Sequence, residues 1–182
     1  MKQLLITTHL YTFAVICVIA TTISSCTFKK KTDMETPTGT KENELTMLVG
    51  TYTSGDSKGI YSFRFNEETG TATALSETEV ENPSYLAVSA DGKFIYTVSE
   101  FNNEQAAANA FAFNQEKGTL KLLNSQKTGG EDPCYIITNG NNVITANYSG
   151  GSISVFPIAK DGSLLPASDI IKFEGSGTDK ER

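Results

Sequence analysis

A group of short, strand-like segments recurs along the chain, and its clearest copy runs from Glu131 to Ile171. In this copy the runs of β-branched and aromatic residues are each too short for a helix. Glycine-containing turns separate them, and glycine supplies the positive φ angles that tight hairpins require. The runs are CYIITN (134–139), NVITANY (142–148), SISVFPI (152–158) and LLPASDIIKF (164–173). This copy therefore predicts a four-stranded antiparallel meander.

Two further copies precede this one. In the copy over residues 82–130, the matching runs are YLAVS (85–89), FIYTVSE (94–100), NAFAF (109–113) and TLKLL (119–123). A partial copy contains MLVGTY (47–52) and GIYSFRF (59–65), and nothing ahead of it matches YLAVS. The first copy is therefore expected to lack the first of its four strands.

The three copies share a turn glycine, Gly70, Gly118 and Gly162, at spacings of 48 and 44 residues. Four-stranded units that repeat at such a period are typical of a β-propeller, in which each unit is one blade. An antiparallel sandwich with evenly spaced turns is the alternative. We predict an all-β fold, a β-propeller of which about three four-stranded blades are present. The expected blades cover residues 45–81, 82–130 and 131–174.

Residues 1–26 have the layout of an export signal. An apolar stretch from Leu10 to Ile23 is followed by small residues and Cys26, which resembles the lipobox of bacterial lipoproteins, where the cysteine is acylated. A transmembrane anchor is the alternative, although the segment falls short of about 18 uninterrupted apolar residues. Residues 27–44 lack periodicity and are expected to form a flexible tether. The predicted product is an exported, membrane-anchored lipoprotein in the periplasm or at the cell surface.

Loss of the signal removes one lysine, Lys2, and no acid, which changes the formal net charge from −6 to −7. An acidic chain without a basic patch is not expected to bind nucleic acid. The one histidine, His9, is lost as well, so the commonest general base is missing from the mature chain. Cys134 is expected to be a small buried hydrophobic residue in a strand. We expect no cofactor and no metal, because the sequence contains no metal-binding, P-loop or nucleophile-elbow motif.

Three stretches together resemble the 6-phosphogluconolactonase and muconate-cyclase (cycloisomerase 2) family of seven-bladed propeller lactonases. They are LVGTYTSGDSKGIYSFRFNEETGTATAL, ENPSYLAVSADGKFIYTVSE and ITANYSGGSISVFPIAKDGSL, and the resemblance covers about residues 46–182. It implies a longer seven-bladed protein of which this chain is the N-terminal part, and hydrolysis of a sugar lactone to the acid in carbohydrate metabolism. The family motif R-Q-x-x-P-H-x-H begins where Arg182 stands, and the family's His and Glu positions lie beyond it. The resemblance therefore implies that the chain alone is inactive.

Lactone hydrolysis needs an activated water, a donor to the developing oxyanion and groups that hold the substrate. In a propeller, the loops between the second and third strands and the loops between blades open on the same face as the central channel. These loops present five candidate substrate-binding residues, Tyr52, Glu100, Asp132, Asn147 and Tyr148. Glu100 has the alternative role of a solvated strand end, and Asp132, which precedes a proline, that of a turn former. Asn147 and Tyr148 precede a Gly-Gly turn, which allows close approach of a ligand.

Two functions of different classes fit these residues. The first is the N-terminal part of a lipid-anchored propeller lactonase, whose partner is a small-molecule lactone. The second is a non-catalytic exported propeller that binds a ligand or a protein on one face, because a fold alone does not assign a function. An exported location favours the second, since phosphorylated sugar lactones are cytoplasmic metabolites.

Overall fold

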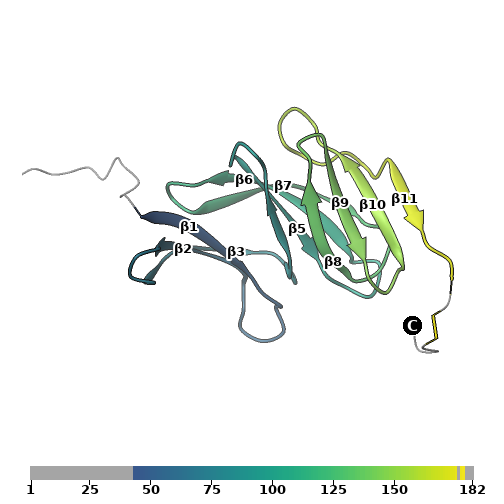
Figure 1. Ribbon diagram of the computed structural model, residues 1–182, viewed down its shortest axis with the longest axis horizontal. Helices are drawn as coiled ribbons and strands as arrows, with labels where there is room; N and C mark the ends of the chain where they lie inside the picture. Colours follow the sequence, from purple (N-terminus) through teal and green to yellow (C-terminus); the bar gives the residue numbers. More distant parts are fainter. Residues whose placement is uncertain (1–42, 176, 179–182) are drawn as a thin grey trace, which may run out of the picture. The chain divides into compact units, whose positions relative to one another are not determined.

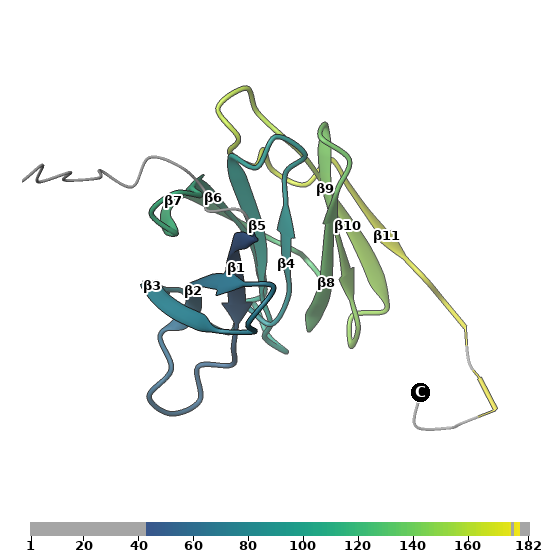
Figure 2. The ribbon, with the colours of Figure 1, turned by 60° about the vertical axis from the view of Figure 1, so that its left-hand side comes forward.

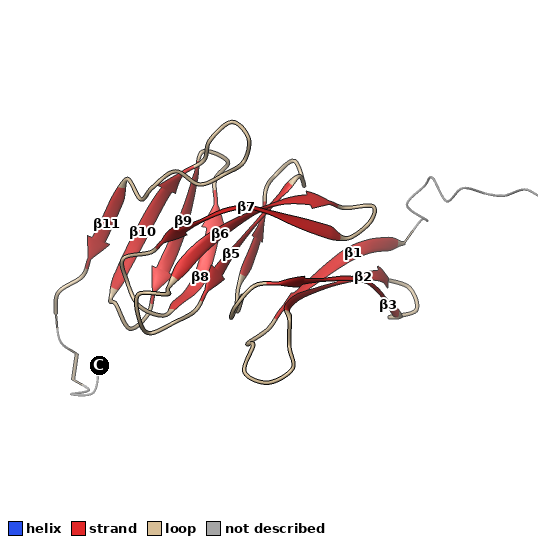
Figure 3. Cartoon of the chain, turned by 180° about the vertical axis from the view of Figure 1, so that it is seen from behind, coloured by secondary structure: helices blue, strands red, loops and turns tan. Residues whose placement is uncertain are grey.

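The computed structural model describes residues 43–175, 177 and 178, which belong to one compact unit, Gly39–Arg182. Every regular element in these residues is a β-strand (Figure 3). The first sheet contains β1 (Glu44–Gly50), β2 (Gly59–Asn66) and β3 (Ala72–Glu79). The second contains β4 (Leu86–Val88), β5 (Phe94–Ser99), β6 (Ala107–Asn114) and β7 (Thr119–Lys127). The third contains β8 (Pro133–Thr138), β9 (Asn142–Asn147), β10 (Ser152–Pro157) and β11 (Asp169–Lys172).

In each sheet the strands pair antiparallel with their neighbours in the chain, and consecutive sheets lie beside each other (Figures 1 and 2). This arrangement confirms the predicted all-β fold, part of a β-propeller with one sheet of three strands and two of four. In the repeat, β1 is equivalent to β5 and β9, the second strands of the other sheets. The described residues contain no counterpart of β4 in the first sheet.

The repeat is also visible in the strand register. The pairing of β2 with β3 shifts between Ser62 and Phe63. The pairing of β6 with β7 shifts between Ala110 and Phe111, at the same position of the next copy. Such a bulge bends a strand and increases its local twist. Two sheets thus carry the same irregularity at the same place, as expected if they descend from one repeated unit.

The fourth strand of the third sheet is shorter than the expected run from Leu164 to Phe173. Leu164 forms only an isolated bridge with Ile158, and regular pairing starts at Asp169, opposite Val155. Pro166 lies in the gap, and proline cannot donate a hydrogen bond to a ladder. The pairing is therefore irregular between Leu164 and Asp169, although the N–H groups of Leu165 and Ser168 still donate to the carbonyls of Pro157 and Val155, each at 2.9 Å.

Consecutive sheets bury apolar side chains between them. The core between the first and second sheets consists of Ile60, Ile95 and Phe111. The core between the second and third sheets consists of Tyr96, Val98, Ala108, Ala110, Ile136, Val143, Phe156 and Leu164. Burying one large aliphatic or aromatic side chain contributes about 1.5–3 kcal/mol. These two layers therefore hold neighbouring sheets against each other.

Two of the repeated turn glycines pack against the preceding sheet. Gly118 has φ +69°, and a Cβ built on it would lie 2.5 Å from the Oγ of Ser62 and 2.8 Å from the Cδ1 of Leu75. Gly162 has φ +86°, and a Cβ there would overlap the ring of Phe94. Gly70 shares the left-handed backbone, φ +70°, but a Cβ there would meet no described atom within 4 Å. The turn thus serves both the hairpin and the contact between sheets.

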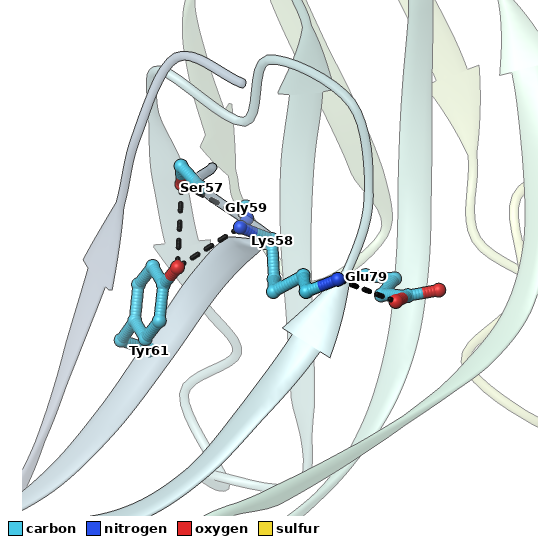
Figure 4. A network of polar contacts seen from close by, with 5 residues as sticks. All are labelled: Ser57, Lys58, Gly59, Tyr61 and Glu79. Atoms are coloured by element: carbon cyan, nitrogen blue, oxygen red, sulfur yellow. Dashed lines mark hydrogen bonds and ion pairs between the residues drawn. The ribbon is translucent and has the colours of Figure 1, made fainter. Parts of the chain in front are cut away.

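The connection between β1 and β2 is held by its own polar contacts (Figure 4). The hydroxyl of Tyr61 accepts a hydrogen bond from the N–H of Lys58 at 2.9 Å and lies 3.5 Å from the Oγ of Ser57. The Nζ of Lys58 lies 3.5 Å from the Oε1 of Glu79. Both charges are solvent-exposed, so this ion pair adds little stability. The hydrogen bonds fix the base of the loop that carries Tyr52.

Cys134 is exposed, which corrects the expectation of a buried residue. The pairing of β8 with β9 shifts register here, because Pro133 lies opposite Asn147 and Tyr135 lies opposite Ala146. Cys134 is therefore the extra residue of a bulge, and the alternation that predicted its burial is interrupted at that point.

The predicted signal, its Cys26 and the tether up to residue 42 lie outside the described residues. Residues 43–175 contain no helix that is long and apolar enough to cross a membrane.

Candidate functional site

Five connections meet at one edge of the three sheets. They are residues 51–58, 80–85, 100–106, 128–132 and 148–151. In Figure 2 the β1–β2 and β9–β10 connections lie at the lower edge, and the long β10–β11 connection lies at the upper edge. We call the edge with the five connections the loop face. It carries four of the five candidate binding residues, Tyr52, Glu100, Asp132 and Tyr148.

Three of the candidates occupy one repeated position. Tyr52, Glu100 and Tyr148 each follow the second strand of their sheet. The residue before each of them makes the last backbone contact of that strand with the third strand; these residues are Thr51, Ser99 and Asn147. Tyr52 and Tyr148 are 56% and 61% exposed, and Glu100 is half-buried. The repeat therefore delivers one long polar side chain from each sheet to the loop face.

Tyr52, Ser84 and Glu100 form a hydrogen-bonded cluster that joins the first two sheets. The hydroxyl of Ser84 donates to the carboxylate of Glu100. The phenol of Tyr52 is hydrogen-bonded to Glu100, and this bond, followed by burial and the charge of Glu100, raises the pKa of Tyr52 above its ordinary value. Tyr52 thus keeps its proton at neutral pH. The cluster presents the carboxylate and two hydroxyl oxygens, all able to accept hydrogen bonds, within one small area.

Asn82 holds this cluster in place. Its Oδ1 accepts hydrogen bonds from the N–H of Thr53 at 2.9 Å and from the Oγ1 of Thr53 at 3.0 Å. Its Nδ2 donates to the carbonyl of Glu100 at 3.2 Å. Asn82 has φ 45°, a left-handed conformation that asparagine adopts more readily than most residues. One side chain therefore ties the loop that carries Tyr52 to the residue after β5.

Asp132 is the equivalent of Asn82 in the next sheet and is also left-handed, with φ 50°. The N–H of Tyr148 donates to the Asp132 carbonyl at 2.8 Å, as the N–H of Glu100 donates to Asn82 at 3.0 Å. The carboxylate of Asp132 accepts a hydrogen bond from the hydroxyl of Ser149. Asp132 therefore shapes its turn, as the alternative interpretation of the sequence expected, and keeps a half-buried carboxylate beside Tyr148.

Asn147 does not reach the loop face. Its side chain is 2% exposed, and its Nδ2 donates to the Oγ of Ser152 at 3.0 Å and of Ser154 at 2.8 Å. Its Oδ1 accepts from the Oγ1 of Thr145 at 3.0 Å. The strand alternation that exposes Tyr148 turns the preceding residue into the space between the second and third sheets. We therefore assign Asn147 to the polar part of the core and not to the ligand site.

The sequence did not predict one feature of the site, an aromatic pair at the inner strands. The rings of Tyr85 and Tyr135 have centroids 4.7 Å apart and planes tilted by 52°. Tyr85 directly precedes β4, and Tyr135 lies in β8, at the matching place of the next copy. The alignment of these two tyrosines was the available signal, because equivalent positions of neighbouring blades face each other.

The loop face is strongly acidic. Its connections carry the acids Asp56, Glu81, Glu100, Glu104, Glu131 and Asp132, against one base, Lys58. Within the described residues these acids form no group of three that could hold a metal ion. The site therefore offers hydrogen-bond acceptors and aromatic surface, and its negative charge disfavours anionic ligands. Arg182, the remaining candidate, lies outside the described residues.

Comparisons with known proteins agree with this architecture. Residues 46–182 match the family model described as lactonase, 7-bladed beta-propeller. A 6-phosphogluconolactonase of Bacillus subtilis is 38% identical over 122 residues, which cover 64% of this chain and 34% of that protein. The chain thus spans about a third of the length of this relative.

Two solved structures are similar as well. A Bacteroides fragilis protein provisionally named a 6-phosphogluconolactonase is 71% identical, with a TM-score of 0.77, over 79% of this chain and 40% of that one. The periplasmic gluconolactonase of Pseudomonas aeruginosa is 32% identical, with a TM-score of 0.64, over 70% of this chain and 38% of that one. The likeness therefore extends to sequence and fold over most of the described residues.

Proposed function

Because this chain belongs to the family of seven-bladed β-propeller lactonases, we propose that the protein hydrolyses a sugar lactone to the corresponding acid. The observation that carries the proposal is the cluster of Tyr52, Ser84 and Glu100 on the loop face. It places several hydrogen-bond acceptors side by side, which suits the hydroxyl donors of a polyhydroxylated ring. The negative charge of the loop face favours an uncharged lactone over a phosphorylated one.

In this proposal the described residues bind and orient the substrate. The carboxylate of Glu100 accepts a hydrogen bond from a hydroxyl group of the sugar, and the phenol oxygen of Tyr52, whose proton is donated to Glu100, accepts from another. Asp132 and Tyr148 supply the same pair of chemistries from the neighbouring sheet. Hydrolysis adds water across the ester bond, so the acyl carbon gains a hydroxyl and the ring oxygen leaves as an alcohol. Holding the ring fixed lowers the entropic part of the barrier to this step.

The experiment is a continuous assay of acid release from D-glucono-δ-lactone and from 6-phosphogluconolactone, with the spontaneous rate subtracted. We expect the protein, when it is produced with all seven blades of the family, to turn over both lactones, with the larger kcat/KM for the uncharged one. A rate equal to the spontaneous one for every lactone would contradict the proposal and support the alternative of a propeller that only binds its ligand.

We also propose that the protein is exported and carries lipid on Cys26. The support is the layout of residues 1–26 and the polar composition of residues 27–44. Acyl chains hold a protein at a membrane through burial of their methylene groups. The test is fractionation of cells that express the wild type or Cys26→Ala. We expect the wild type in the membrane fraction and the variant outside it, and equal distribution of the two would overturn the lipid anchor.

A further inference from the structure

The aromatic pair of Tyr85 and Tyr135 joins the second and third sheets at their inner strands but lies outside the buried cores. The two side chains remain 42% and 41% exposed, although their rings touch. Large aromatic residues in a sheet usually bury most of their surface. Neither ring belongs to the two buried cores. Two exposed rings held side by side on adjacent sheets therefore form an apolar surface that is open to a ligand.

The backbone fixes both rings. The carbonyl of Tyr85 accepts a hydrogen bond from the N–H of Val98 at 3.2 Å. Tyr135 pairs with Ala146 in the β8–β9 ladder. Because the backbones of both residues are hydrogen-bonded to a neighbouring strand, the surface that the rings offer is preorganised.

This pair lies next to the polar cluster. Tyr85 directly follows Ser84, whose hydroxyl contacts the Glu100 carboxylate. The N–H groups of Val98 and Glu100, two residues apart in the chain, donate to the carbonyls of Tyr85 and Asn82, so the aromatic pair and the cluster lie at the same end of β5. The aromatic surface and the Tyr52–Glu100 cluster are therefore parts of one site.

A carbohydrate ring matches this combination. One face of a pyranose-like ring consists of C–H groups with partial positive charge, and the face of an aromatic ring is negative. The rim of the sugar carries hydroxyl groups, which suit the carboxylate and phenol nearby. We propose that Tyr85 and Tyr135 form a stacking platform for the ring of the sugar lactone, with the hydroxyl groups of the ring directed toward Glu100. This subsite rests on the proposed lactonase function.

The test measures binding separately from turnover. The probe is D-gluconolactam, an uncharged ring analogue that resists hydrolysis, titrated calorimetrically into the wild type and into Tyr85→Ala, Tyr135→Ala, Tyr85→Phe and Tyr135→Phe. The phenylalanine variants are the matched controls, because they keep the ring and lose only the hydroxyl. We expect each alanine variant to weaken lactam binding by about fivefold and each phenylalanine variant to stay within about twofold of the wild type. If an alanine variant does not fold, the leucine variant at the same position keeps apolar bulk without a ring and replaces it.

A second readout compares the KM of D-glucono-δ-lactone with that of δ-valerolactone, a lactone without hydroxyl groups. Loss of a ring is expected to raise the first KM more than the second. If lactones are hydrolysed while the alanine variants bind the lactam like the wild type, the platform is wrong and the lactonase stands. If no lactone is hydrolysed but lactam binding depends on the two rings, the result supports the stacking platform and contradicts the proposed lactonase activity.

Discussion

Asn82 and Glu100 hold each other through two hydrogen bonds, one in each direction. The N–H of Glu100 donates to the Asn82 carbonyl at 3.0 Å, and the Nδ2 of Asn82 donates to the Glu100 carbonyl at 3.2 Å. The Oδ1 of Asn82 also accepts from the N–H of Thr53, the neighbour of Tyr52. A residue with no contact to substrate in our proposal thus sets the relative positions of Tyr52 and Glu100.

Asn82→Ala should therefore destabilise the fold and loosen the site. The variant loses three half-buried hydrogen bonds and puts alanine into a left-handed backbone, which together cost about 2–3 kcal/mol. Asn82→Asp is the matched control, because it keeps the acceptor for Thr53 and loses only the donor. Urea denaturation should rank the variants as wild type, then Asp, then Ala. Equal midpoints for wild type and Asn82→Ala would contradict this role.

The packing of the repeated turn can be measured with a pair of glycine variants. Gly70→Ala and Gly118→Ala introduce the same methyl group at nearly the same φ, 70° and 69°. Only at Gly118 does the methyl group meet Ser62 and Leu75 of the preceding sheet. We expect Gly70→Ala to cost about 1 kcal/mol from backbone strain and Gly118→Ala to cost about 1–3 kcal/mol more from overpacking. Thermal unfolding of both variants gives the difference, and similar melting temperatures would argue against a tight contact between the sheets.

Asn147→Ala separates a structural role from a binding role. The variant leaves the buried hydroxyls of Ser152 and Ser154 without their donor, and we expect a loss of about 2–3 kcal/mol in unfolding free energy. Since Asn147 is buried away from the loop face, KM for the lactone should stay within about twofold of the wild type at a temperature where the variant is folded. A stable variant with a large rise in KM would return Asn147 to the ligand site.

The Tyr52–Glu100 hydrogen bond has a signature at alkaline pH. A folded-state pKa raised above the ordinary value near 10.0 means that the bond stabilises the fold fully below pH 10 and that this contribution is lost as the pH rises through the folded pKa. Glu100→Gln removes the charge, so the pKa of Tyr52 should fall toward its ordinary value. Absorbance titration of tyrosinate, with Tyr52→Phe to identify the signal, measures both values. An unchanged pKa in Glu100→Gln would show that another group holds the phenol.

Much of the architecture could be predicted because the repeat carries it. Each strand of the second copy has a counterpart in the third, and the turn glycines fix the hairpins through their positive φ angles. The errors arose where one residue breaks the pattern. Pro166 interrupts the fourth strand of the third sheet, and the bulge at Cys134 reverses the expected burial. The interrupted strand and the bulge each occur in one copy and do not recur with the repeat, so the periodicity of the sequence could not predict them.

The site was predicted less completely than the fold. Repeat alignment brought Tyr52, Glu100 and Tyr148 to the loop face, because equivalent residues of neighbouring blades lie on the same edge. The prediction placed Asn147 there too, because it directly precedes Tyr148. Neighbours in a strand point to opposite sides, and the Asn147 side chain is buried. The contacts of Asn82 with Thr53 and of Ser84 with Glu100 join residues distant in the chain, and such contacts follow from packing and not from local sequence.

The kinetics of Glu100→Gln with D-glucono-δ-lactone test the central claim most directly. Glu104→Gln is the control, because Glu104 is exposed in the same connection and carries the same charge. Replacing the carboxylate by an amide weakens a charge-assisted hydrogen bond to the sugar, and kcat/KM should fall by about tenfold or more. Glu104→Gln should leave kcat/KM within about twofold of the wild type. Equal kcat/KM for Glu100→Gln and the wild type would contradict the assignment of the Tyr52–Glu100 cluster as the lactone site.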